Sequence, residues 1–303
     1  MSALGNNEKA FLVGDNPFHQ ISHLSQDRTK TRSKAVASPE SAAQLILSSV
    51  ENGANGFMFS VSKTTLSILA ALRELGQIDR LELYPIMPYA YEYVQLATQV
   101  GGISGLAKSF GKQVFFSMNL SAMWNGLIAA LRMDPVSFMK AYLSYEVGRI
   151  RSVAGKDSHI RALVLHEVIT DMALGLKMEW FFKAYAEYVS RHGFLPGFNT
   201  CNFAFLVNRF RDWDINVSNM VIAAPFNKIG FQMCPSRTEC ESALAGLSEP
   251  VLIAISILAA GYLQLPQAVA YIAALPNIKG VAVGISKEKH ASETFGILKK
   301  MLI

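Results

Sequence analysis

The sequence predicts an α/β protein folded as a single-domain (β/α)8 TIM barrel over residues 1–303. Eight short apolar runs alternate with segments of helical periodicity, and each connection is long enough to hold a helix, so the strands should pair in parallel. The centres of "RALVLHE" and "VLIAISIL" are apolar at successive positions, as expected of strands covered on both faces. An open doubly wound sheet is the alternative. It is disfavoured because no GxGxxG follows the first strand and eight units match barrel closure.

The predicted strands follow one another at intervals that leave room for helices. They span 10–14, 56–61, 81–88, 160–167, 193–201, 220–227, 251–258 and 280–286. The first helix should begin at Pro39, which suits a first helical position, with Ser38 as its cap. Further helices are expected over 64–75, 135–153, 177–192 and 203–211, and after each of the last three strands. Residues 89–134 are interpreted as an insertion after the third strand, helical over 90–110.

Composition excludes several classes of protein. With 51% hydrophobic and 17% charged residues, the chain can form a large core and does not resemble a disordered protein. Neither a membrane span nor a secretory signal is expected, since no uncharged apolar run approaches the required length. The cysteines Cys201, Cys234 and Cys240 form no CxxC pair, which fits a reducing, cytoplasmic location. Nucleic-acid binding is not expected, because the basic residues are not interleaved with aromatic ones.

Polar residues concentrate where the predicted strands end. In this fold, binding and catalytic residues lie at the carboxyl ends of the strands and in the loops that follow them. The residues that should share this rim are Asp15, Asn16, Ser60, Ser62, Lys63, Tyr89, Tyr91, Glu92, His166, Glu167, Asn199, Asn202, Asn227, Lys228, Ser286 and Lys287. The sequence therefore predicts a functional site at this end of the barrel.

His166 is the leading catalytic candidate. It ends an apolar run, so it should lie partly buried at the barrel mouth and act as a general acid, base or electrophile. A buried structural histidine is the alternative. Asp15 either accepts a proton or satisfies backbone donors in the turn before Pro17. Lys63 and Lys228 either form a Schiff base with a carbonyl substrate or hold an anionic group of that substrate.

The other residues near the rim are expected to contact the substrate. They are Asn16, His19, His23, Glu92, Glu167 and Asn227. Glu167 could equally face the helices or cap one of them. Asp15, His19 and His23 recur every four residues, which on a helix would form one metal-binding face. Pro17 interrupts such a helix, so no metal site is expected.

An anion-binding site is expected in the loops after the seventh and eighth strands. Gly261 and Gly284 would allow backbone amides to approach an anion, whereas Ser286 and Lys287 precede a helix whose amino-terminal dipole favours negative charge. Barrels commonly bind phosphate here. Close packing of the glycines is the alternative. A small anionic, phosphorylated substrate would also be attracted by the basic residues after the first strand, Arg28, Lys30, Arg32 and Lys34.

Residues 160–302 resemble the aldo-keto reductase superfamily. The similar segments are "LVLHE", "GFNTCNFAFLVNRF", "VIAAPFN", "ILAAGYL" and "GVAVGISKEKHASET". The resemblance implies an NAD(P) cofactor, with His166 polarising a substrate carbonyl. It further implies that Asn199, Thr200 and Asn202 border the nicotinamide amide. The cofactor phosphate and adenine would then be met by Ser286, Lys287, Lys289 and Glu293.

The resemblance fails at three catalytic positions. The family has Asp and Tyr after the second strand and Lys at the end of the third, and neither "GFMFSVSKTT" nor "YPIMP" supplies them. Tyr89 or Tyr91 is the candidate replacement for the tyrosine acid. His166 at the rim and the similar segments within residues 160–302 nevertheless make an NAD(P)-dependent oxidoreductase the leading hypothesis. A Schiff-base or acid/base lyase and a catalytically inactive ligand-binding barrel are the alternatives. The aromatic residues of 177–192 fit self-association or core burial.

Overall fold

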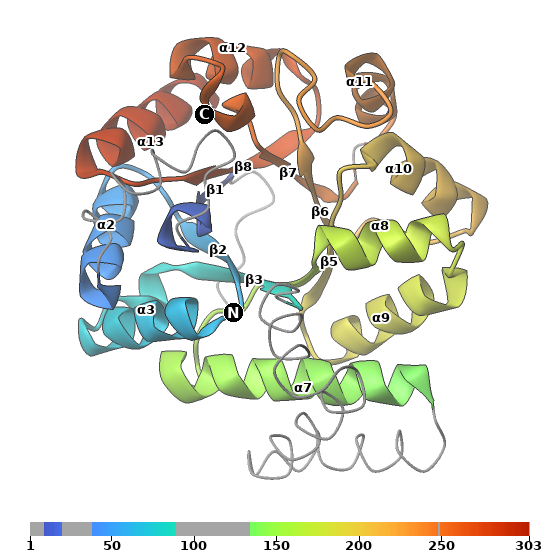
Figure 1. Cartoon of the computed structure of the whole chain (residues 1–303), viewed down its shortest axis with the longest axis horizontal. Helices are drawn as coiled ribbons and strands as arrows, with labels where there is room; N and C mark the ends of the chain where they lie inside the picture. Colours follow the sequence, from blue (N-terminus) through green and yellow to red (C-terminus); the bar gives the residue numbers. More distant parts are fainter. Residues whose placement is uncertain (1–8, 20–37, 89–133, 248, 303) are drawn as a thin grey trace, which may run out of the picture.

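Eight parallel strands form a closed barrel in the computed structural model of the chain (Figure 1). The structure describes residues 9–19, 38–88, 134–247 and 249–302. The strands pair in sequence order and β8 returns to β1, which confirms the predicted (β/α)8 class. Their bounds are β1 Ala10–Gly14, β2 Gly56–Ser60, β3 Glu82–Met87, β4 Ala162–Leu165, β5 Leu195–Asn199, β6 Val221–Pro225, β7 Val251–Ile255 and β8 Ile278–Gly284.

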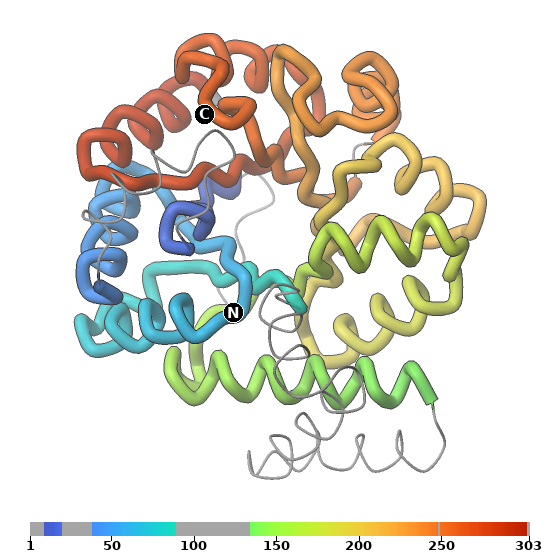
Figure 2. The backbone as a smooth tube through the Cα atoms, in the orientation of Figure 1, coloured from blue at the N-terminus to red at the C-terminus, as the bar shows by residue number. Residues whose placement is uncertain are grey.

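The described helices surround this barrel (Figures 1 and 2). They are α2 Pro39–Glu51, α3 Lys63–Glu74, α7 Pro135–Ala154, α8 Glu167–Gly175, α9 Glu179–Arg191, α10 Phe203–Asp212, α11 Arg237–Ala245, α12 Leu265–Ala274 and α13 Glu288–Leu302, with the 3-10 turns η1 Asn16–His19, η2 Ile78–Arg80 and η3 Ala259–Gly261. As predicted, α2 begins at Pro39, and the Ser38 side chain accepts a hydrogen bond from the backbone N–H of Ser41. None of these helices is long and apolar enough to cross a membrane.

Alternation along the strands separates two cores. Inside the barrel, small and medium side chains fill the lumen, among them Leu12, Met58, Val164 and Ala223. The intervening residues of each strand face the helices and form a larger core, in which Phe182 and Phe198 pack with their ring centroids 5.6 Å apart. This two-sided burial is the reason that the strands are apolar at successive positions.

The ends of the sheet meet between β8 and β1 (Figure 2). Ala10 lies opposite Gly280 in the register, and a Cβ added at Gly280 would lie 2.8 Å from the carbonyl oxygen of Ala10. The missing side chain therefore allows the two strands to approach closely.

The helix α8 was not expected from the sequence. The fourth strand ends at Leu165 instead of continuing to residue 167, and α8 begins at Glu167. Two predicted regions, the basic loop after β1 and the insertion up to residue 133, lie outside the described residues. In α9, Phe182 and Tyr185 are buried in the core, whereas Trp180 is 46% exposed.

Candidate active site

His166 directly follows β4 and Asn199 ends β5, each one residue beyond the paired residues Leu165 and Phe198. Ala162 and Val164 of β4 face the barrel lumen, and the backbone of His166 remains extended, with φ of −62° and ψ of 143°. Strand alternation therefore turns His166 to the lumen side as well. On β5, Leu195 contacts the lumen core, so Asn199, four residues later, also faces inward. Because β4 and β5 are paired, the two side chains belong to one opening.

The two nitrogens of His166 have different surroundings. Nδ1 accepts a hydrogen bond from the backbone N–H of Val168, 3.2 Å away, and thereby caps α8. A neutral ring with this bond carries its proton on Nε2. Burial lowers the pKa of His166, and the negative charges of Glu167 and Asp15 oppose this shift only partly. The side chain is therefore a neutral imidazole near pH 7, with Nε2–H as a hydrogen-bond donor.

Asn199 carries an unsatisfied acceptor at the same opening. Its side chain is 7% exposed, and its Oδ1 atom has no hydrogen-bond partner within the described part of the chain. Buried amide oxygens almost always accept a hydrogen bond, so an orphan of this kind calls for an explanation. A ligand with an N–H or O–H group at the barrel mouth would supply the missing donor.

The segment that follows Asn199 is held by a helix of the preceding barrel unit. The Thr200 hydroxyl donates to Oδ1 of Asp171 at 2.5 Å, and the backbone N–H of Cys201 donates to Oδ2 at 3.2 Å. The Thr200 hydroxyl also accepts from the N–H of Asn202 at 2.9 Å. Asp171 lies in α8, so the helix capped by His166 also holds the loop beside Asn199.

Asp171 helps to position the loop after Asn199, and the sequence analysis did not predict this role. The stretch from Ala162 to Gly175 is predominantly apolar across the junction between β4 and α8, so periodicity does not separate the strand from the helix. An acidic residue one turn into a helix that starts at a rim histidine was the available signal.

Asp15 joins the first two strands. Its Oδ2 atom accepts a hydrogen bond from the backbone N–H of Ser60 at 2.6 Å and lies 3.0 Å from Nε2 of His19. Asp15 thus satisfies a backbone donor, as one of its two predicted roles required, although the donor belongs to β2 and not to its own turn. Asn16 is exposed next to it.

Asn227 and the two candidate lysines make no contact with His166 or Asn199 among the described hydrogen bonds. The fully buried amide of Asn227 donates to the carbonyl of Phe231 at 2.8 Å and accepts from its N–H at 2.7 Å, so its own loop engages both groups. Lys63 is exposed as the first residue of α3, and Lys228 is exposed in the loop after β6. Neither lysine has the desolvated surroundings typical of Schiff-base chemistry.

Other predicted residues can be placed only in part. Glu167 is half-buried at the start of α8 and accepts a hydrogen bond from the thiol of Cys201 at 3.8 Å. Tyr89, Tyr91, Glu92 and His23 lie outside the described residues. Across 9–19, 38–88, 134–247 and 249–302, no group of three His, Cys, Asp or Glu side chains could hold a metal ion.

The loops after β7 and β8, which were predicted to bind an anion, contain both a glycine that is explained by packing and a strained backbone segment. A Cβ at Gly284 would lie 2.8 Å from Cδ of Pro17, so this glycine is explained by close packing against η1. Ser286 is buried, and Lys287 is exposed directly before α13. In the loop after β7, Ala259 and Ala260 have φ of 47° and 59°, leading into Gly261 at 96°. Such strained backbone is concentrated at functional sites in proteins.

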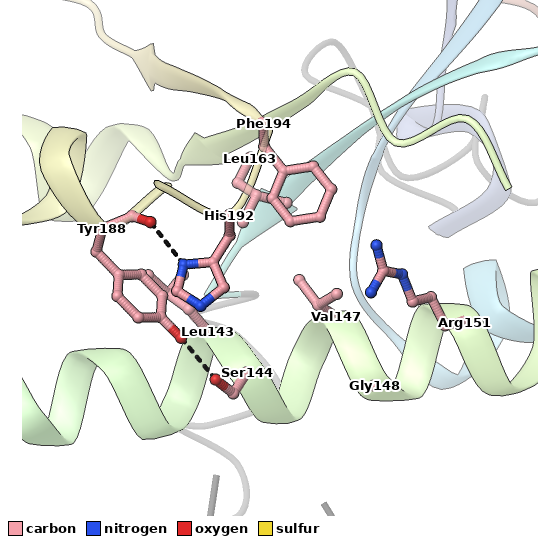
Figure 3. Close-up of a pocket in the computed structure, with 9 residues that line it drawn as sticks. All are labelled: Leu143, Ser144, Val147, Gly148, Arg151, Leu163, Tyr188, His192 and Phe194. Carbon is pink, nitrogen blue, oxygen red and sulfur yellow. Dashed lines mark hydrogen bonds between the residues drawn. The ribbon is translucent and has the colours of Figure 1, made fainter. Parts of the chain in front are cut away.

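A separate pocket lies outside the barrel, between α7 and α9 (Figure 3). It has a volume of about 200 Å³, and Leu163 lines it from the helix-facing side of β4. Tyr188 and Ser144 share a hydrogen bond of 2.6 Å across it, and Nδ1 of His192 donates to the Tyr188 carbonyl at 2.8 Å. None of the rim residues predicted for the active site lines this pocket.

Comparison with known proteins supports the fold. Two solved structures of candidate aldo-keto reductases from Pseudomonas aeruginosa align with 97% of this chain and with 91% and 90% of their own. Their TM-scores are 0.59 and 0.57, with 13% sequence identity in each case. No protein-family model and no curated protein matches the chain. The chain therefore shares the (β/α)8 barrel fold of these two structures.

Proposed function

We propose that the protein is an oxidoreductase of divergent aldo-keto reductase type that acts with NAD(P) on a small anionic carbonyl metabolite. The observation that carries this proposal is the pairing of a neutral His166 with the unsatisfied Asn199 at one barrel mouth. Together they offer a donor for a carbonyl oxygen and an acceptor for an amide group. The similarity of the fold to candidate aldo-keto reductases supports the same class of chemistry.

The residues at the mouth fit a nicotinamide cofactor. The carboxamide of nicotinamide has an NH2 group, which would satisfy the orphan Oδ1 of Asn199. Ser286 and Lys287 stand at the start of α13, where backbone amides and the helix dipole favour a phosphate. When bound, the cofactor supplies a hydride to the substrate or accepts one from it.

His166 would stabilise the charge that develops on the substrate oxygen. Its Nε2–H would donate a hydrogen bond to the carbonyl, and this bond strengthens as the oxygen becomes negative. Burial keeps the ring neutral, and the cap on α8 fixes its orientation before the substrate arrives. Proton delivery is assigned to Tyr89 or Tyr91, the tyrosines that follow β3 in the sequence.

A catalytically inactive ligand-binding barrel is the second candidate. It is favoured by the lumen-facing ends of β2 and β3, where Ser60 and Ile86 provide no strong proton donor. A lyase finds less support, since Lys63 and Lys228 are both exposed.

Cofactor titration separates these functions. Nicotinamide fluorescence should report binding of NADPH or NADH, and Asn199→Ala should weaken that binding about tenfold through loss of one hydrogen bond in a buried site. Asn208→Ala, on the exposed face of α10, is the matched control and should bind as the wild type does. His166→Ala should leave cofactor binding intact and lower turnover roughly 100-fold.

Two results would contradict the oxidoreductase assignment. The first is the absence of cofactor binding up to millimolar concentration. The second is cofactor binding without turnover of any aldehyde or ketone, which would instead establish the ligand-binding barrel.

A further inference from the structure

The three cysteines of the chain gather at one edge of the barrel mouth. Cys201 follows β5, Cys234 lies in the loop between β6 and α11, and Cys240 belongs to α11. The backbone N–H of Cys234 donates to the carbonyl of Cys201 at 3.0 Å. The thiol of Cys240 donates to the carbonyl of Cys234 at 3.4 Å. The main chain of Cys234 is therefore held between the other two cysteines.

Cys201 and Cys234 are neighbours in space through their main chains. With ordinary covalent bond lengths, a main-chain N···O distance of 3.0 Å keeps the Cα atoms of Cys201 and Cys234 within roughly 7 Å of each other. A disulfide spans Cα separations of roughly 4.4–6.8 Å. The fold thus brings together two residues that are separated by most of a barrel unit in the sequence, without help from the thiols themselves.

The two thiols differ in exposure and in partners. Cys234 is exposed, so a soluble oxidant reaches it first. Cys201 is half-buried, and burial together with the nearby charges of Glu167 and Asp171 raises the pKa of its thiol to about 12. Its S–H donates to Oε2 of Glu167 at 3.8 Å, so a proton acceptor is already in contact with it. Cys240 is fully buried, out of reach of the oxidant.

We propose that Cys201 and Cys234 form an intramolecular disulfide when a peroxide oxidises the protein. Hydrogen peroxide first converts the Cys234 thiol to a sulfenic acid and is itself reduced to water. The Cys201 sulfur then attacks the Cys234 sulfur, Glu167 accepts the Cys201 proton, and the S–O bond breaks. The departing hydroxide takes that proton and leaves as a second water. In balance, two thiols and one peroxide give one disulfide and two waters.

The disulfide would act on the barrel mouth. It would tie the loop after β5 to the loop after β6, two residues from Asn199, and withdraw the Cys201 thiol from Glu167. Glu167 is also one of the charges that act on His166, so oxidation would change the surroundings of both central mouth residues. This proposal rests on the two cysteines and Glu167 and is independent of the reaction proposed above.

Thiol counting and peptide mapping test the proposal. The full-length reduced protein is treated at low concentration with a small excess of hydrogen peroxide, and the remaining thiols are then alkylated. The free thiols should fall from three to one per chain, with a single linkage between the peptides of Cys201 and Cys234. Cys201→Ser and Cys234→Ser should each abolish that linkage. Cys240→Ala is the matched control and should still form it.

A second variant tests the role of the carboxylate. Glu167→Gln should slow disulfide formation about tenfold or more, because the acceptor for the Cys201 proton is lost. The Cys234 sulfenic acid should then accumulate and react with dimedone. Glu179→Gln, on the exposed part of α9, should form the disulfide at the wild-type rate.

Three outcomes would overturn the proposal. These are a count that stays at three thiols, a linkage that joins Cys234 to Cys240, and a linkage between two separate chains. A wild-type rate of disulfide formation in Glu167→Gln would refute the role of Glu167 as proton acceptor. Peptide mapping alone would then decide whether Cys201 pairs with Cys234.

Discussion

The imidazole of His166 ends one strand and caps the helix that follows. Its Nδ1 atom is committed to the backbone of α8, which leaves Nε2 for chemistry at the barrel mouth. The same bond stabilises the neutral ring, since protonation of Nδ1 would remove the acceptor from the Val168 N–H. Burial acts in the same direction on the pKa. Local structure and electrostatics therefore favour one protonation state and one tautomer.

The tautomer of His166 is directly measurable. In alkaline solution, long-range ¹H–¹⁵N spectra should show the proton on Nε2 of His166. They should show it on Nδ1 of His192, which donates to the carbonyl of Tyr188 and serves as an internal control. The same tautomer at both histidines would contradict the assigned hydrogen bonds.

Protonation of His166 should also link stability to pH. Its folded-state pKa is lowered from 6.5, so the unfolded chain binds a proton at higher pH than the native protein does. Above pH 6.5 the neutral His166 ring makes its full contribution to the free energy of unfolding. This contribution is lost as the pH falls from 6.5 towards the folded-state pKa. Urea unfolding of the wild type should show this loss of free energy, and His166→Asn should show a flatter dependence. Equal slopes in the two proteins would contradict it.

At the scale of elements, α8 connects the two central residues of the mouth. It begins at the His166 cap, and one turn later Asp171 holds the segment that follows Asn199. Thr200 is fully buried, so its hydroxyl has no access to water as a replacement partner. The position of the β5–α10 loop therefore depends on a helix from the preceding unit of the barrel.

Removal of the Asp171 carboxylate should weaken this connection. Asp171→Ala leaves the Thr200 hydroxyl and the Cys201 N–H without their acceptor, at an expected cost of about 1.5–3 kcal/mol in the free energy of unfolding. Hydrogen exchange at the Cys201 amide should accelerate as well. Asp212→Ala removes a largely exposed ion pair with Arg209 and should cost less than about 1 kcal/mol. Equal losses in the two variants would show that Asp171 has no special role.

At the scale of the whole molecule, closure of the barrel depends on close contacts between strands. The sheet closes where β8 pairs with β1, and Gly280 permits that approach. Gly56 and Gly197 have similar surroundings, with Glu82 O and Val164 Cγ2 each 2.7 Å from an added Cβ. The lumen is narrow, so these glycines lie at positions where larger side chains would collide with backbone.

A pair of glycine substitutions tests this reading. Gly280→Ala places a Cβ 2.8 Å from the carbonyl oxygen of Ala10, which belongs to rigid backbone, and should destabilise the protein by about 1–3 kcal/mol. Gly296→Ala, in α13, meets nothing within 4 Å and should stabilise the helix by roughly 0.5–1 kcal/mol. Urea unfolding of both variants gives the two free energies. A neutral Gly280→Ala would mean that the closing strands can separate without cost.

Much of the architecture was accessible from local patterns. The predicted strand 251–258 contains β7, and the prediction of a helix beginning at Pro39 is confirmed. Hydrophobic runs and turn residues report such elements because they arise from interactions between near neighbours. The predominantly apolar stretch around His166 gave no boundary of this kind, so α8 and Asp171 were not predicted.

The hydrogen-bond partners of individual side chains could not be predicted from local sequence patterns. Asn227 was predicted to contact substrate, yet both groups of its amide bind Phe231 in its own loop. Asp15 was predicted either to accept a proton or to satisfy backbone donors of its own turn, and its carboxylate instead accepts a hydrogen bond from the backbone of Ser60. A rim position specifies which end of the barrel a residue occupies, but the direction of its hydrogen bonds depends on loop geometry.

The sequence by itself determined the barrel and the end at which its polar residues gather, because strand periodicity and the order of elements are local properties of the chain. Only the tertiary structure decided which of those residues are committed to structure and which remain available. The hydrogen bond from Ser60 to Asp15, the bonds from Thr200 and Cys201 to Asp171, and the lone acceptor of Asn199 each depend on the placement of residues far apart in the sequence. Hydrogen bonds act over about 3 Å, and only the folded chain sets such distances.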